Sequence, residues 1–255
     1  MHSEQTPLVS VIMPMHNSER FLYAAIESVI SQTFTNWELL VIDDASSDNS
    51  LTIAESYARK DKRIHIFKSD HHIGMPSAPR NKGVSMASGR FIAFLDSDDL
   101  WKPDKLAQQL PFFEDPLVAI VYSNYEKTNE DGTPQPHRII RAPKQVTYKQ
   151  LLMGNIIGNL TGIYDSKKVG KIEIRDIHHE DYVMWLTILK KGFLARNTGT
   201  VNAIYRTHKG SVSSDKLRVV SWQWNIYRHL EQLSVIQSTY YYVNYALRAL
   251  IKSLT

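Results

Sequence analysis

The chain has 255 residues, 43% of them hydrophobic, which suits one large α/β domain or a domain with an appendage. It contains no cysteine, so disulfide bonds and thiolate chemistry are excluded. The formal net charge of +4 is compatible with phosphate ligands or an anionic membrane surface, but it is too small to indicate a nucleic-acid partner. The polar N-terminus does not resemble a signal peptide, and no apolar run is long enough to span a bilayer.

The first hundred residues alternate between short apolar strands and amphipathic helices. Strands are expected at 8–13, 37–42, 64–67 and 91–95, and helices at about 18–33, 51–58 and 77–86. Such alternation in short units indicates parallel strands joined by right-handed crossovers. The expected fold class is therefore α/β.

The rest of the chain continues with less regular elements. Helices are expected after Pro103, at 148–153 and from 178 to about 190, and strands at 118–123, 160–164, 193–196 and 201–205. Asp131-Gly132 indicates a hairpin, followed by a loop or hairpin arm at 133–146. From about Asp215 the chain is expected to be helical, with a bend near Gln237-Ser238.

Carboxylates follow two of the expected strands. Asp43 and Asp44 come after the strand at 37–42, and Asp96, Asp98 and Asp99 come after the strand at 91–95. Parallel strands end at the same edge of a sheet, which is where open α/β sheets bind ligands. Clustered oxygen donors suit Mg²⁺ or Mn²⁺ bound together with substrate phosphates. Either group alone could be an acidic turn that caps a helix, but two at one edge favour a site.

A further acidic pair, Glu180 and Asp181, opens the helix expected from about residue 178. First-turn acids also interact favourably with a helix dipole, so a purely structural role is the alternative. Zinc is not predicted, because adjacent histidines point apart and no cysteine or spaced partner completes a tetrahedral set. The two histidine pairs are His71-His72 and His178-His179.

Five segments resemble, in order and rough spacing, the motifs of family 2 glycosyltransferases. They are VIMPMHN at 11–17, LVIDDASSD at 40–48, RNKG at 80–83, LDSDD at 95–99 and HED at 179–181. The resemblance covers residues 8 to about 214. The helical end is similar to that of bacterial members that build surface polysaccharides such as O-antigen or capsule. The resemblance implies a GT-A fold, with a Rossmann-like, mostly parallel sheet flanked by helices and a C-terminal helical extension.

The same resemblance implies an inverting transfer of a hexose-type sugar from a nucleotide sugar, usually UDP-linked. The implied acceptor is a hydroxyl of a lipid-linked saccharide, and the implied cofactor is Mn²⁺ or Mg²⁺. Residues 1–115 would bind the nucleotide sugar, 116–214 would bind the acceptor and supply the base, and 215–255 would form the extension. The implied location is cytoplasmic, on the inner face of a bacterial cell membrane.

The resemblance also implies roles for individual residues. Asp181 would be the general base and Glu180 would orient it, because a sugar hydroxyl needs a positioned base to become a good nucleophile. The metal ligands would be Asp98, Asp96 and His208. The nucleotide sugar would contact Pro14, His16, Asn17, Asp44, Ser46, Arg80, Asp96, Ser97 and Arg206, with Asp44 accepting from the uracil N–H. The family often has Tyr in place of His16, so base stacking is expected to be weaker or pH-sensitive here.

Two other functions stay open on the sequence. A nucleotidyltransferase that makes sugar nucleotides would share the sheet and the acids, but residues 14–17 are not a Gly-rich phosphate loop. A non-catalytic nucleotide- or glycan-binding partner would not need the acids at 180–181. The aromatic and basic helix at 239–252 is compatible with core packing, with an oligomer contact or with a membrane surface.

Overall fold

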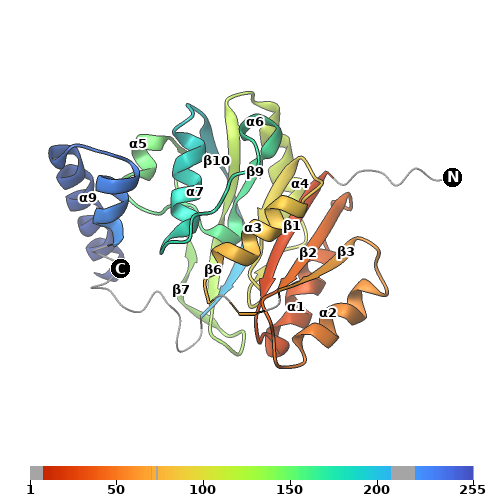
Figure 1. Ribbon diagram of the computed structural model, residues 1–255. Coiled ribbons are helices and arrows are strands. Elements are labelled where there is room, and N and C mark those ends of the chain that lie inside the picture. Colours follow the sequence, from red (N-terminus) through yellow and green to blue (C-terminus); the bar gives the residue numbers. More distant parts are fainter. Residues whose placement is uncertain (1–7, 70, 73, 208–221, 255) are drawn as a thin grey trace.

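The computed structural model of the protein describes residues 8–69, 71–72, 74–207 and 222–254. Within this part of the chain, one ten-stranded sheet has the order β3-β2-β1-β4-β9-β6-β10-β5, with β7 paired to β6 and β8 to β10. Helices cover both faces of the sheet (Figure 1). The expectation of an α/β fold is confirmed.

The first four strands form the parallel part of the sheet. They are β1 (Val9–Met15), β2 (Trp37–Asp43), β3 (Ile64–Lys68) and β4 (Phe91–Phe94), and the pairs β1–β2, β1–β4 and β2–β3 are parallel. Three helices connect them, α1 (Glu19–Ile30), α2 (Ser50–Ala58) and α3 (Ser77–Met86). Nearly all residues of β1, β2 and β4 are buried, as expected for strands covered on both faces.

Beyond β4 the sheet becomes mixed. The elements are β5 (Leu100–Trp101), α4 (Lys105–Gln109), η1 (Leu110–Glu114), β6 (Val118–Thr128), β7 (Pro134–Ile140), β8 (Gln145–Val146), α5 (Tyr148–Leu151), η2 (Asn159–Thr161), β9 (Ile163–Asp165), α6 (Ser166–Val169), α7 (Glu180–Leu189) and β10 (Leu194–Arg206). Strand β9 runs antiparallel to both β4 and β6, and β10 runs parallel to β6. The sequence predicts two strands in this region, but the structure has only one, β10. Its pairing with β6 continues across an irregular stretch between Asn197 and Ala203.

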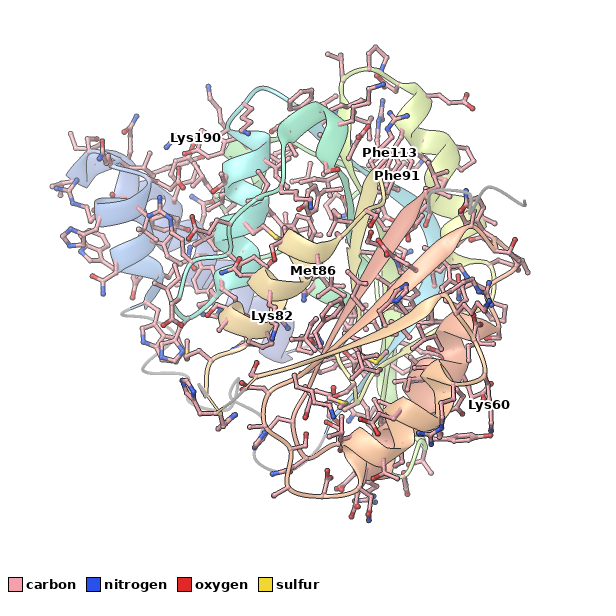
Figure 2. The ribbon with its side chains drawn as sticks, turned by 45° about the vertical axis from the view of Figure 1, so that its right-hand side comes forward. Lys60, Lys82, Met86, Phe91, Phe113 and Lys190 are labelled. Atoms are coloured by element: carbon pink, nitrogen blue, oxygen red, sulfur yellow. The ribbon has the colours of Figure 1, made fainter. Side chains whose placement is uncertain are left out.

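The core has two halves, one on each face of the sheet. One half joins α1, α2 and η1 to the sheet, and it includes the stacked rings of Phe91 and Phe113, 4.5 Å apart (Figure 2). The other half joins α3, α5 and α7 to the opposite face. Helix α3 lies very close to β1, because a Cβ on Gly83 would come within 2.5 Å of Ile12 Cγ2. This close packing fixes the side chains of α3 relative to the strand ends.

The C-terminal helices lie at one end of the molecule, beside α5 and α7 (Figure 1). They are a π-helical turn (Ile226–Leu230) and α9 (Val235–Leu254). Glu231 anchors the connection, since its Oε2 accepts from Tyr148 Oη at 2.6 Å and Lys190 Nζ at 2.9 Å. The predicted bend at residues 237–238 is misplaced. The chain turns at 231–234, and Gln237 instead caps the new helix through reciprocal hydrogen bonds with Ser234.

Candidate active site

The candidate site lies at the edge of the sheet where β1, β2 and β4 end. Met15 is paired with Asp43, so the loops after β1 and β2 leave the sheet side by side. Ile12 is paired with Phe94, the last residue of β4, which brings Asp96 to the same edge. The parallel topology thus gathers the predicted carboxylates, as the order of strands and helices in the sequence indicates.

Asn17 ties the loops after β1 and β2 together. Its Oδ1 accepts from the backbone N–H groups of Ser47 at 2.8 Å and Asp48 at 3.3 Å. Its own N–H donates to Ser46 Oγ at 3.1 Å. Asn17 and Ala45 both have left-handed backbone conformations, with φ of 47° and 55°. Such conformations in non-glycine residues are uncommon and concentrate at functional sites. The structure therefore joins two predicted binding residues, Asn17 and Ser46, in one network.

A pocket of about 200 Å³ lies beside this network. It is lined by Pro14, Met15, His16, Asp44, His72, Gly74, Met75, Pro76 and Pro79. Three of these residues, Pro14, His16 and Asp44, were predicted to contact the nucleotide sugar, whereas Asn17, predicted with them, is not among the lining residues. His72 was not predicted. Its ring stacks on that of His16 with centroids 3.8 Å apart and planes 14° apart, and its Nδ1 lies 2.6 Å from Asp44 Oδ2.

His16, Asp44 and His72 offer ligand atoms within 4.8 Å of one another, so the prediction that His72 has no spaced partner is wrong. Their geometry still does not suit zinc. A metal ion lies in the plane of each imidazole that binds it, on the axis of the nitrogen lone pair. Two nearly parallel rings stacked 3.8 Å apart cannot both meet that condition for one tetrahedral ion.

Arg80 connects the end of β4 to the start of α7. Its Nη2 lies 2.6 Å from Asp96 Oδ1, and its Nη1 donates to Glu180 Oε1. The Arg80 side chain is only 7% exposed. Burial alone would lower the pKa of Arg80, but the charges of Asp96 and Glu180 raise it above its ordinary value. Arg80 is therefore a permanent buried cation between two carboxylates that are 84 residues apart in sequence.

Asp181 lies next to this ion-pair network at the first turn of α7. Burial raises its pKa above the ordinary aspartate value, while Arg80 and a hydrogen bond from Asn155 oppose that shift. Asn155 Nδ2 donates to Asp181 Oδ2 at 3.3 Å, and the Tyr182 N–H donates to Oδ1 at 2.7 Å. Burial likewise raises the pKa of Glu180. Positioned carboxylates with raised pKa values are suited to accept a proton.

The acids after β4 differ in their environments. Asp96 and Asp98 are partly exposed, whereas Asp99 is 1% exposed and accepts from the Arg206 N–H at 2.9 Å. Burial, with the charges of Asp98 and Asp96, raises the pKa of Asp99 well above its usual range. The oxygen donors of Asp96 and Asp98 fit a hard divalent cation that also takes ligands from phosphates. Asp99 anchors the end of β10 instead.

The remaining predicted residues fall on the same edge, with one outside the described structure. Ser97 Oγ lies 2.7 Å from Ser18 Oγ, which ties the β4 loop to the start of α1. The Arg206 guanidinium stacks over the ring of Phe21 at 4.6 Å. His208, a predicted metal ligand, lies outside the described residues.

His72 and Asn155 are the site residues that the sequence did not single out. His72 follows β3, which is parallel to β2, so its loop must emerge at the same sheet edge as Asp44. That topological signal was present in the sequence. Asn155 lies in a stretch between α5 and η2 that has no regular periodicity. Its contact with Asp181 was therefore not predictable.

Known proteins share this fold. The fold resembles that of the solved TarS 1–349 of S. aureus in complex with UDP-GlcNAc, with a TM-score of 0.72 and 20% identity over 94% of this chain and 71% of that one. A model of the family "Glycosyl transferase family 2" matches residues 10–174. This segment contains Asp44, Arg80 and Asp96, and Glu180 and Asp181 follow it.

Two relatives match nearly the whole chain. TuaG of Bacillus subtilis (strain 168), named for teichuronic acid biosynthesis, is 38% identical over 97% of this chain and 98% of its own length. The UDP-Glc:alpha-D-GlcNAc-diphosphoundecaprenol beta-1,3-glucosyltransferase WfgD of Escherichia coli is 38% identical over 93% of this chain and 92% of its own. The chain belongs to glycosyl transferase family 2 and is a glycosyltransferase with a GT-A fold. In the part of the chain that the structure describes, no helix combines the length and apolarity needed to cross a bilayer.

Proposed function

We propose that the protein transfers a hexose from a UDP-sugar, with inversion, to a hydroxyl of a lipid-linked saccharide during assembly of a bacterial surface polysaccharide. The observation that carries this proposal is the network in which buried Arg80 holds Asp96 against Glu180, next to Asp181. The network connects Asp96, which is proposed to act on the nucleotide side, to Glu180 and to the proposed general base Asp181. The names of WfgD and TuaG, together with the UDP-GlcNAc complex of TarS, support the donor and acceptor classes.

The donor's nucleoside is proposed to bind in the pocket between the ends of β1 and β2. The base stacks on His16 and donates an N–H to Asp44, while Pro14 forms a wall of the pocket. Asn17, Ser46 and Ser97 are proposed to hold polar groups of the ribose, which is supported by the hydrogen bonds that join Asn17 to Ser46 and Ser97 to Ser18.

The diphosphate is proposed to lie beside Asp96, Asp98 and Arg206. Asp98 and Asp96 would hold Mn²⁺ or Mg²⁺, a cation that neutralises the charge developing on the leaving diphosphate. Arg206 lies at the end of β10, where its backbone is fixed by Asp99, and its guanidinium adds positive charge at this edge. Arg80 keeps Asp96 in place.

Asp181 is proposed to take the proton from the acceptor hydroxyl. The hydroxyl oxygen then attacks the anomeric carbon as the bond from that carbon to the diphosphate oxygen breaks, so the products are the inverted glycoside and UDP. Glu180, fixed by Arg80, orients this turn of α7. One carboxylate on the acceptor side is sufficient for a single displacement.

Helix α9 is proposed to rest on the inner face of the cell membrane, next to a lipid-linked acceptor. Ile236, Tyr240, Val243 and Leu247 recur at helical spacing and are 83%, 54%, 49% and 53% exposed. We call these four residues the α9 stripe. The sequence 235–254 contains no acidic residue and two basic ones. An apolar stripe on a helix without acids fits an anionic lipid surface.

The proposal is tested by incubating the protein with Mn²⁺, UDP-glucose and GlcNAc-diphosphate-lipid, and analysing the products by mass spectrometry and NMR. The expected products are UDP and a lipid-linked disaccharide with a β linkage formed from the α-linked donor. Other UDP-hexoses are screened in parallel. Release of pyrophosphate in a reaction with UTP and a sugar phosphate would instead indicate a nucleotidyltransferase. Nucleotide binding without turnover on any acceptor would indicate a non-catalytic partner.

A further inference from the structure

His72 occupies the position that the proposed function gives to the nucleotide base. Its flat ring is stacked on His16 at 3.8 Å, and its Nδ1 lies 2.6 Å from Asp44 Oδ2. These are the two interactions, one ring face and one N–H donor, that a bound base is proposed to make. We propose that His72 is an internal competitor of the base, and that it sets the affinity for the nucleotide. The inference rests on the proposed function of the pocket.

The two occupants exclude each other for steric reasons. A base inserted between His16 and His72 would need the two rings to be about twice as far apart as they are. The Asp44 side chain is only 6% exposed, and Asp44 is one of the residues that line the pocket. The oxygen that His72 engages is therefore not available to a base N–H until His72 moves away.

His72 can leave the pocket at low cost. Its side chain is 46% exposed, and it belongs to the connection between β3 and α3 rather than to a strand or a helix. Among the described residues, displacement breaks the stack on His16 and the hydrogen bond to Asp44 without opening the core. The fraction of molecules with His72 displaced limits the apparent affinity for nucleotide.

The test is calorimetric titration of the full chain with UDP and Mn²⁺. The variants are His72→Ala, the neighbouring exposed control His71→Ala, and Asp44→Asn. If His72 is populated in the pocket about nine-tenths of the time, His72→Ala binds UDP about tenfold more tightly. His71→Ala behaves as wild type. Inorganic pyrophosphate with Mn²⁺ binds equally to wild type and His72→Ala, because it has no base.

The outcomes separate this inference from the proposed function. If wild type binds UDP, Asp44→Asn weakens binding, and His72→Ala leaves it unchanged or weaker, the pocket assignment stands and the competition is contradicted. If wild type does not bind UDP, or Asp44→Asn has no effect, the pocket assignment itself fails. Tighter binding of both UDP and pyrophosphate by His72→Ala would also contradict a base-specific effect.

Discussion

At the scale of single residues, Asn155 adjusts the proton affinity of the proposed base. Burial raises the pKa of Asp181, and the hydrogen bond from Asn155 opposes that shift. Acidification inactivates a general base by protonating it. A base with a raised pKa is therefore inactivated at a higher pH than an ordinary aspartate. Removing the opposing hydrogen bond raises the pKa further. Asn155→Ala should therefore move the acid limb of the profile of kcat/KM against pH toward higher pH.

The comparison needs a control asparagine away from the site. Asn129 lies in the exposed β6–β7 turn, where its side chain bonds to Thr133. Asn129→Ala should leave the limb in place. Asp181→Asn should retain UDP binding and lower kcat by about 10²- to 10⁴-fold. If the acid limb of the kcat/KM profile of Asn155→Ala does not move, or moves toward lower pH, the assignment of Asp181 as the general base is contradicted.

Arg80→Ala should destabilise the protein, because the substitution leaves Asp96 and Glu180 without their shared cation. Breaking a buried ion pair by removing one partner costs about 3 kcal/mol or more in the free energy of unfolding. Without Arg80 the pKa of Glu180 rises further, and protonation of Glu180 removes the uncompensated buried charge. The loss in the free energy of unfolding should therefore become smaller as the pH falls. Urea unfolding at pH 7.5 and 5.5 measures both effects.

The exposed pair Lys68–Glu55 supplies the control for Arg80. Lys68→Ala should leave the urea midpoint close to that of wild type at both pH values, since exposed ion pairs contribute little. An Arg80→Ala variant as stable as Lys68→Ala would show that the buried network does not hold the site together.

At the scale of secondary structure elements, Gly162 determines how closely α7 approaches the sheet. A Cβ at Gly162 would lie 2.6 Å from Cζ2 and 2.8 Å from Cη2 of Trp185, a fully buried residue of α7. Gly162→Ala should therefore displace α7, and with it Asp181. We expect a loss of about 1–3 kcal/mol in the free energy of unfolding together with a lower kcat.

Gly158, in the same segment, supplies the matched control. Its added Cβ would meet neighbouring atoms at 3.4 Å, which is an ordinary contact distance. Gly158→Ala should keep near wild-type stability and activity in thermal unfolding and transfer assays. If Gly162→Ala were equally well tolerated, the position of α7 would not depend on this contact.

The regular elements were predictable because each carries a local signal. The four parallel strands and the helices between them show clear periodicity, and their order alone places the acids after β2 and β4 at one edge. The two-residue strands β5 and β8 carry no such signal, since their pairing depends on β10. The break before α9 depends on the cap formed by Ser234 and Gln237, and the sequence predicts it a few residues too late.

Parts of the site depended on contacts between distant segments. The motifs identified Arg80, Asp96 and Glu180, but they did not show that Arg80 holds the other two together. The stacking of His72 on His16 likewise joins two loops that are 56 residues apart in sequence. Only the folded chain reveals which residue occupies a pocket.

At the scale of the whole molecule, the α9 stripe is expected to attach the enzyme to lipid. Ile236→Ser together with Val243→Ser removes two exposed apolar side chains without touching the core. Each loss weakens burial in the lipid interface, so cosedimentation with anionic liposomes should fall about tenfold. Met86→Ser removes an exposed apolar side chain from α3 and serves as the control (Figure 2).

A different result would reassign the α9 stripe. If the double variant binds liposomes as well as wild type does, the membrane role of α9 is contradicted. Analytical ultracentrifugation of the same variant then shows whether the stripe is a contact between subunits, since a dimer that becomes a monomer would identify that role.

The acids at the ends of β2 and β4 are proposed to bind a uridine nucleotide with a divalent cation. Calorimetric titration of UDP, GDP and CDP, with and without Mn²⁺, on wild type and Asp98→Asn measures this binding. We expect UDP to bind most tightly, its binding to require Mn²⁺, and Asp98→Asn to weaken that binding. If no nucleotide binds, or if binding is indifferent to both Mn²⁺ and Asp98, the acids after β4 form only a structural turn and the proposed site is contradicted.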